Sequence, residues 1–337
     1  MHALLLAAVL NISDVAKDAI AKNHLPAMSI TVMNADGLVA QGVAGVRKMG
    51  SRARVKQDDA FHIGSCTKPI TATIVAQLVE EKKLAFDTTI GAAFSDWNDI
   101  RPEYKDVTVA ELLSHESGLP AFDDDADFKG MPADRTAFVH EALKRAPVVK
   151  RGEYKYSNAG FSTVAVIAER ASGMSWERLV ETRIFAPLHL RTAGFGWPRE
   201  VWGFAEGKPV DPKGAYQLGK TIAPAGDIHM SSGDLAEFLR AHLRALRGTK
   251  TLITPQTATL MHTRRLRSGL GFGVQKIGDL EPVSVYSGSA DTFVTVFAVA
   301  PSANVLVVVD TNAGDENAQK AAGATLKALL ARFASKP

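Results

Sequence analysis

The segment Phe61–Lys83, FHIGSCTKPITATIVAQLVEEKK, is the starting point for interpreting this chain. After Gly64 its apolar residues recur at helical spacing, which predicts a helix that begins near Ser65 and buries one stripe. Pro69 is tolerated in the first turn of a helix, where its missing N–H needs no partner. Because Ser65 and Lys68 are three residues apart, their side chains lie on one face of the helix.

A hydroxyl at a helix N-terminus with an amine one turn away can do chemistry. The free N–H groups and the helix dipole favour negative charge there, and the amine can accept or relay a proton. The alternative to a catalytic role is a structural one, since serine is a common N-cap and lysine a common helix residue. A Ser-x-x-Lys pattern also occurs about once by chance in a chain of this length. Other segments must therefore decide between the two interpretations.

The composition argues against nucleic-acid binding and against a metal site or a disulfide. The chain has 337 residues, 46% of them hydrophobic, enough for one large core or two moderate ones. Its 39 basic and 36 acidic residues are mixed along the chain and give a net charge of +3, so we expect no nucleic-acid partner. A single cysteine, Cys66, excludes an internal disulfide and a Cys-based zinc site, and the histidines lack metal-site spacing. We expect neither a metal nor a cofactor.

The N-terminus allows two interpretations. Ala3–Leu10 is an apolar run as long as a signal-peptide core, but no Lys or Arg precedes it. It is either the remnant of an export signal or the buried first turns of the opening helix. No segment is long enough to span a membrane. We favour a periplasmic or secreted location over a cytoplasmic one, and the sequence predicts no oligomeric state.

Periodicity predicts strands near both ends of the chain and helices in its middle. The expected strands cover residues 28–33, 38–43, 272–277, 283–286, 292–300 and 305–310. The expected helices cover residues 12–24, 107–113, 136–145, 161–170, 176–185, 234–246 and 316–333. Tight turns between sequential strands, such as Asp36-Gly37, predict an antiparallel sheet and therefore an α+β fold. We expect residues 1–64 and 225–337 to form an α/β lobe and 65–224 a mainly helical lobe, with the site in the cleft between them.

Three short segments can converge on one site: Ser65-Cys66-Thr67-Lys68, Tyr156-Ser157-Asn158 and Tyr286-Ser287-Gly288-Ser289. With them the sequence resembles the serine β-lactamase and penicillin-binding-protein superfamily, whose nucleophile lies in a Ser-x-x-Lys motif. The Tyr-x-Asn element resembles the branch of class C β-lactamases, D,D-peptidases and family VIII carboxylesterases. Further family landmarks occur in the family's order at Phe61–Ser65, Leu112–Pro120 and Pro224–Gly226.

The resemblance implies a β-lactamase/transpeptidase-like fold and acyl transfer through a covalent intermediate on Ser65. Lys68 and Tyr156 are the candidates for taking the serine proton, and a Lys68 cation would lower the pKa of the Tyr156 phenol. Asn158 would hydrogen-bond Lys68 and the acyl side chain. The backbone N–H groups of Ser65 and Ser289 would form the oxyanion hole, worth on the order of 100- to 1000-fold in rate.

One position departs from the lactamase pattern. Where those enzymes carry Lys at the start of the third element, this chain has Tyr286, which offers a neutral hydrogen bond and an apolar face. Lys suits a substrate carboxylate, so Tyr286 favours a neutral small-molecule substrate and hence a carboxylesterase. A nearby arginine, Arg264, Arg265 or Arg267, would reverse this preference by supplying the charge.

The alternatives are a β-lactamase, a D,D-peptidase or D-aminopeptidase that acts on amides, and a catalytically silent penicillin-binding-like protein. Two residues near the motifs are given structural roles. Cys66 is expected to pack beside the nucleophile, and His115 to brace its turn.

Overall fold

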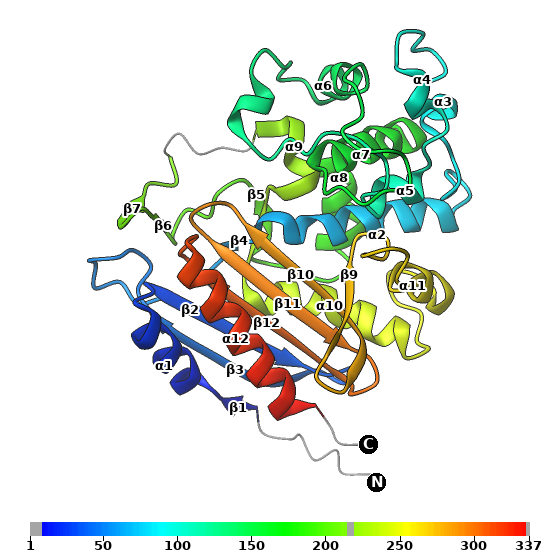
Figure 1. The fold of residues 1–337 in the computed structure, drawn as a ribbon. Coiled ribbons are helices and arrows are strands. Elements are labelled where there is room, and N and C mark those ends of the chain that lie inside the picture. The colour runs from blue at the N-terminus through cyan, green and yellow to red at the C-terminus, as the bar shows by residue number, and fades with distance from the viewer. Residues whose placement is uncertain (1–8, 214–218, 335–337) are drawn as a thin grey trace.

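Seven strands form the central sheet of the computed structural model, which describes residues 9–213 and 219–334 (Figure 1). In spatial order they are β1 (Leu10–Asn11), β3 (Leu38–Gly45), β2 (Ala27–Met33), β12 (Val305–Thr311), β11 (Val294–Ala300), β10 (Leu280–Ser289) and β9 (Gly273–Ile277). Neighbouring strands are antiparallel apart from β1, which runs parallel to β3. The predicted α+β fold with a mainly antiparallel sheet is confirmed.

Strand β1 corrects one interpretation of the N-terminal apolar run. Leu10 pairs with Ala40 and is extended, so this end of the run is not part of the opening helix. Residues 3–8 lie outside the described residues. Among the described residues, no helix is both long and apolar enough to cross a membrane.

Two helices cover one face of the sheet, α1 (Ser13–Asn23) and α12 (Glu316–Phe333) (Figure 1). Side chains alternate along each strand, so every second residue of β11 and β12 meets these helices. In β12 these are Val305, Val307 and Val309, which pack with the inner leucines of α12. The predicted helices over 12–24 and 316–333 are confirmed to within a residue at each end.

The opposite face of the sheet carries α10 (Ser232–Leu246) and, beyond it, the helical part of the chain (Figure 1). At the centre of that part is α2 (Thr67–Glu80). The remaining helices are α3 (Ile90–Ala93), α4 (Pro102–Lys105), α5 (Val109–Leu113), α6 (Arg135–Ala142), α7 (Asn158–Ser172), α8 (Trp176–Val180), α9 (Gly219–Gly226) and α11 (Pro255–Met261), and a π-helical turn, Glu181–Phe185, follows α8.

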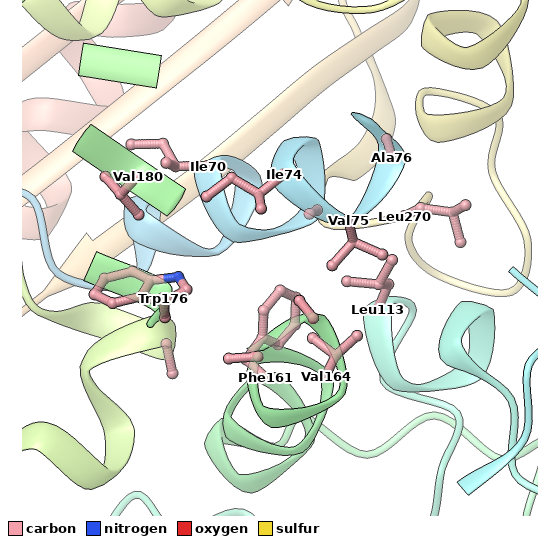
Figure 2. Packing of buried hydrophobic residues seen from close by; sticks show 14 of the residues in the cluster. Ile70, Ile74, Val75, Ala76, Leu113, Phe161, Val164, Trp176, Val180 and Leu270 are labelled. Atoms are coloured by element: carbon pink, nitrogen blue, oxygen red, sulfur yellow. The ribbon is translucent and has the colours of Figure 1, made fainter. Parts of the chain in front are cut away.

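Helix α2 differs from its prediction. We expected one buried stripe, but every residue from Thr67 to Ala76 is buried, because helices and strands surround it. Figure 2 shows Ile70, Ile74 and Val75 of α2 packed among side chains of several neighbouring helices. A helix buried on all sides holds its polar side chains away from bulk water, which matters for Lys68.

Several elements were not predicted. Helix α9 contains Pro224, and α11 begins at Pro255, with Thr254 capping it by accepting a hydrogen bond from Thr257 N. The short strands β4 (Phe61–His62), β5 (Gly194–Phe195), β6 (Gly203–Ala205), β7 (Lys208–Val210) and β8 (Ile228–Met230) are too brief to show a two-residue period. The division into lobes at residues 64/65 and 224/225 stays our proposal.

Candidate active site

Ser65 lies in a 3-10 turn, Gly64–Cys66, and α2 begins after it at Thr67. Pro69 therefore occupies the third residue of α2, within the turn whose N–H groups have no partner in the helix. The Ser65 side chain is partly exposed, whereas Lys68 is fully buried one turn further on. A reactive hydroxyl thus has solvent on one side and a buried amine on the other.

The Lys68 amine has three oxygen neighbours. Its Nζ lies 3.0 Å from Ser65 Oγ, 2.8 Å from Asn158 Oδ1 and 2.7 Å from the carbonyl oxygen of Ala225. Asn158 Nδ2 donates to Phe122 O at 2.8 Å, which orients the amide so that its oxygen faces the lysine. Two of the three neighbours can only accept, so the Ser65 hydroxyl is the one partner that can exchange a proton with the amine.

Tyr156 completes the group around the hydroxyl, with its Oη 2.6 Å from Ser65 Oγ. Its position follows from the cap of α7. Ser157 caps this helix by accepting from Gly160 N at 3.0 Å, and its own hydroxyl donates to Pro120 O at 2.6 Å. The residues on either side of the cap, Tyr156 and Asn158, consequently both face Ser65 and Lys68.

Burial sets the protonation of this group. It holds the pKa of the Lys68 amine well below its usual range, because the charged form is desolvated. Burial also raises the pKa of the Tyr156 phenol, although its hydrogen bond with Ser65 acts in the opposite direction. The expectation that a Lys68 cation lowers the pKa of Tyr156 is therefore wrong, since both groups favour their neutral forms.

Two glycines bring the end of β10 against the Ser65 turn. A Cβ on Gly64, which has φ +50°, would lie 2.7 Å from Ser289 N, and one on Gly288 would lie 2.9 Å from Ser65 N. Such distances leave no room for a side chain at either position. The two backbone segments expected to form an oxyanion hole, at Ser65 and Ser289, are thus in close approach.

Tyr286 and Ser287 lie next along β10. The hydroxyl of Tyr286 is 3.4 Å from His115 Nε2, and Ser157 N donates to His115 Nδ1 at 3.2 Å. Because Nδ1 accepts, the ring proton is on Nε2 and points at Tyr286. Burial lowers the pKa of His115 to about 3, so the imidazole is neutral. His115 does brace its turn, and it also contacts a predicted site residue, which the sequence did not indicate.

The three arginines named as possible sources of charge have different positions. Arg264 donates to Leu266 O, and Arg265 pairs with Glu116 at 3.3 Å. Arg267 is exposed, stands 5.6 Å from the centre of the Tyr154 ring, and lines the same cavity as Tyr286. Of these three arginines, Arg267 is the one that lines this cavity.

Ala225 is the contact that sequence reasoning missed. Its carbonyl oxygen lies in the last turn of α9, where carbonyls have no partner within the helix and can accept from Lys68. In the sequence, Pro224–Gly226 resembles a family landmark, but that resemblance assigns Ala225 no role. Cys66 is fully buried and donates through Sγ to Thr295 O at 3.6 Å, as expected of a packing residue.

A metal site requires several ligating side chains grouped together. Within residues 9–213 and 219–334, no three His, Cys, Asp or Glu side chains are grouped to hold a metal ion.

The comparisons with known proteins agree with this architecture. Penicillin-binding protein 4 of Amycolatopsis lactamdurans is 27% identical over 326 residues, covering 87% of this chain and 82% of its own. D-amino acid amidase from Ochrobactrum anthropi SV3, solved with L-phenylalanine, superposes with a TM-score of 0.80 at 20% identity, over 95% of this chain and 97% of its own. EstCE1, described as a hydrolase with promiscuous acyltransferase activity, superposes with a TM-score of 0.78 at 15% identity. The match covers 94% of this chain and 96% of the EstCE1 chain. These two structures establish likeness of fold.

The family assignment rests on the sequence itself. The profile described as Beta-lactamase matches residues 12–332, which is nearly the whole described chain and includes all three site segments. The chain therefore belongs to the beta-lactamase family, within the serine β-lactamase and penicillin-binding-protein superfamily.

Proposed function

We propose that this protein is a serine hydrolase that forms an acyl-enzyme on Ser65, and that it acts as a carboxylesterase on small esters. The observation that carries the proposal is the position of Ser65 Oγ, 3.0 Å from the Lys68 amine and 2.6 Å from the Tyr156 hydroxyl. A serine hydroxyl needs a base to become a nucleophile, and here two candidate groups contact it.

Lys68 is the base in this proposal. A neutral amine has two N–H groups and one lone pair. Asn158 Oδ1 and Ala225 O accept the two N–H groups, which leaves the lone pair directed at Ser65. As Ser65 Oγ bonds to the ester carbonyl carbon, its proton passes to Lys68 Nζ. Burial lowers the pKa of this amine and so favours the neutral form that carries the lone pair.

Tyr156 donates a proton to the leaving alcohol when the tetrahedral intermediate breaks down. When the bond between the acyl carbon and the alcohol oxygen breaks, Tyr156 protonates that oxygen and is reprotonated from Lys68 through the shared hydrogen bonds. The backbone N–H groups of Ser65 and Ser289 stabilise the negative oxygen of the tetrahedral intermediate. Water then attacks the acyl-enzyme by the same proton route in reverse.

Tyr286 supports an ester over a carboxylate-bearing substrate. Its hydroxyl is neutral, because burial raises its pKa and its neighbour His115 is uncharged. The second candidate function is hydrolysis of a β-lactam or a D-amino-acid amide or peptide. Arg267 favours the β-lactam and the peptide, because a guanidinium lining the cavity beside Tyr286 can pair with the carboxylate of either substrate.

The test combines labelling with a substrate panel. A fluorophosphonate should label Ser65, as located by mass spectrometry, and Ser65→Ala should abolish the label. p-Nitrophenyl acetate should be hydrolysed with a higher kcat/KM than nitrocefin, a D-alanyl dipeptide or D-phenylalanine amide. Labelling at another serine contradicts the nucleophile. Labelling of Ser65 with preferred turnover of nitrocefin or the amides replaces the esterase by the second candidate. Labelling with no turnover of any substrate identifies a silent, penicillin-binding-like protein.

A further inference from the structure

A cavity of about 340 Å³ lies beside the proposed site and extends to the other face of the sheet. At one end it is lined by Tyr156 and Tyr286, and at the other by Gly323 and Leu326 of α12. Tyr156 is the residue whose hydroxyl contacts Ser65 Oγ, so the cavity and the nucleophile share Tyr156 as a neighbour, although Ser65 itself does not line the cavity.

The sheet is open where the cavity crosses it. Strand β9 pairs with β10 only as far as Gly273, opposite Val285, and then diverges. The residues of β10 that follow, starting with Tyr286, have no partner on this side in the pairing with β9. Val285 packs in the cluster beneath α12, while Tyr286 packs in the cluster around α2. The cavity thus passes around a sheet edge from the site face to the helix face.

The lining is apolar, and α12 leaves space for a ligand. Phe272, Ile277 and Val296 contribute to the walls, and the two charged lining residues, Arg267 and Lys327, are exposed. A Cβ on Gly323 would meet no atom within 4 Å. The volume of 340 Å³ is roughly twice that of an apolar cavity of ~150 Å³ that binds benzene. An alkyl chain of several carbons or a fused aromatic group fits such a space.

We propose that this cavity binds the alcohol part of the ester substrate, so that the enzyme prefers esters of bulky apolar alcohols with small acyl groups. This inference rests on the proposed esterase function. The leaving oxygen must contact the group that protonates it, and Tyr156 both has that role and lines the cavity. Asn158, which we assign to the acyl side, contacts Lys68, and none of Ser65, Lys68 and Asn158 lines the cavity. With Tyr156 as the proton donor, the alcohol departs on the side of Tyr156, where the cavity lies.

Gly323 is the position at which the cavity can be filled without touching the site. It lies within α12 at ordinary helical angles, so Gly323→Phe places a ring in the open space. Ala324→Phe is the matched control, because Ala324 is the next residue of the same helix and is exposed.

The experiment compares two ester series in the full-length protein, both followed by acid release. One series lengthens the alcohol from ethyl acetate to octyl acetate, and the other lengthens the acyl group from ethyl acetate to ethyl octanoate. Each buried methylene should raise kcat/KM about fourfold in the alcohol series until the cavity is full. Gly323→Phe should lower kcat/KM for octyl acetate at least tenfold and that for ethyl acetate less than twofold, whereas Ala324→Phe should change neither.

Binding without catalysis separates this inference from the proposed function. In Ser65→Ala, 1-octanol should bind more tightly than ethanol by calorimetry, and the additional Gly323→Phe change should weaken octanol binding at least tenfold. If esters are not hydrolysed but octanol binds in this way, the esterase proposal fails and the apolar cavity remains. Equal chain-length dependence in the two series, a preference in the acyl series alone, or equal effects of Gly323→Phe and Ala324→Phe would overturn the inference.

Discussion

The two faces of the central sheet are built from different chemistry. On the face beneath α1 and α12, the strands present apolar side chains, mostly valine and alanine, to apolar side chains of the helices. On the opposite face the same strands present buried polar groups among apolar side chains such as Phe297 and Val308. Ser29 and Thr31 of β2 lie 2.9 and 2.8 Å from Ser232 Oγ of α10, and Asp310 of β12 accepts from Thr295 of β11 at 2.8 Å. One face therefore contributes mainly apolar burial, while the other must satisfy polar groups next to the site.

A buried pair of histidines, His242 and His262, adds further hydrogen bonds on the polar face of the sheet. Thr73 of α2 donates to Pro69 O, so its oxygen accepts from His242 Nε2 at 2.9 Å. His242 Nδ1 is 3.0 Å from His262 Nε2, and His262 Nδ1 is 2.6 Å from Ser284 Oγ of β10. Burial lowers the pKa of both imidazoles, that of His242 to about 3, so each ring has one donor and one acceptor. The chain of bonds joins the helix of Lys68 to the strand of Tyr286. No comparable polar chain occurs under α12 in the described residues.

The largest expected effect is on activity, at Lys68. Lys68→Met should lower kcat/KM by about 10²- to 10⁴-fold, because it removes the base. The free energy of unfolding should stay equal or rise, because a desolvated amine is replaced by an apolar side chain of similar length. Ester kinetics and urea unfolding measure the two quantities. Lys155→Met, at an exposed lysine near the site, is the control and should change neither. Full activity in Lys68→Met would remove the amine from the mechanism.

On the face of the sheet beneath α12, a substitution should lower stability and leave activity nearly unchanged. Leu329 is 2% exposed and packs against the sheet from α12. Leu329→Ala should lower the free energy of unfolding by about 2–5 kcal/mol through lost burial and a cavity, with kcat changed less than twofold. Lys320→Ala, on the exposed side of the same helix, should leave both values unchanged. A large loss of kcat in folded Leu329→Ala would show that the two faces are coupled.

The buried carboxyl of Asp310, on the polar face of the sheet, should make the free energy of unfolding depend on pH. Burial raises the pKa of its carboxyl to about 7, so the folded protein holds this proton more tightly than the unfolded chain. Its contribution to stability is present at low pH and is lost as pH rises from about 4 to 7, by up to ~4 kcal/mol. Asp310→Asn stays neutral and keeps an oxygen for Thr295. It should therefore unfold with a larger free energy than wild type at pH 8, by about 2–4 kcal/mol, and with nearly the same value at pH 4. An identical difference at both pH values would contradict the assignment.

The smallest expected effect concerns substrate choice at Tyr286. Tyr286→Lys should shift the ratio of kcat/KM toward nitrocefin and away from p-nitrophenyl acetate by about tenfold or more, since a charge-assisted hydrogen bond contributes about 1.5–3 kcal/mol. Tyr286→Phe, which adds no charge, should leave the ratio nearly unchanged. If Arg267 already holds the carboxylate, wild type should hydrolyse nitrocefin well and Tyr286→Lys should change little. Arg267→Gln would then remove that activity.

Much of the sheet was predictable because its signals are local. The strands β2, β3, β11 and β12 and the helix α12 follow from two-residue and helical periods within a few residues of their observed ends. Helix α9 was missed because Pro224 interrupts its pattern, and β1 because two residues show no period. The parallel pairing of β1 with β3 depends on how the chain returns to the sheet, which no local pattern encodes.

The sequence by itself determined the fold class, the family and the residue types of the site. Ser65 and Lys68 share a local turn, Tyr156 and Asn158 flank a helix cap, and glycine at positions 64 and 288 permits close backbone approach. Only the tertiary structure decided the protonation and the surroundings of these groups. Asn158 and Ala225, which fix the Lys68 amine, lie 90 and 157 positions away from it in the chain. The low pKa of Lys68 and the cavity that reaches α12 both arise from burial between distant segments, and burial is not a property of any single stretch of sequence.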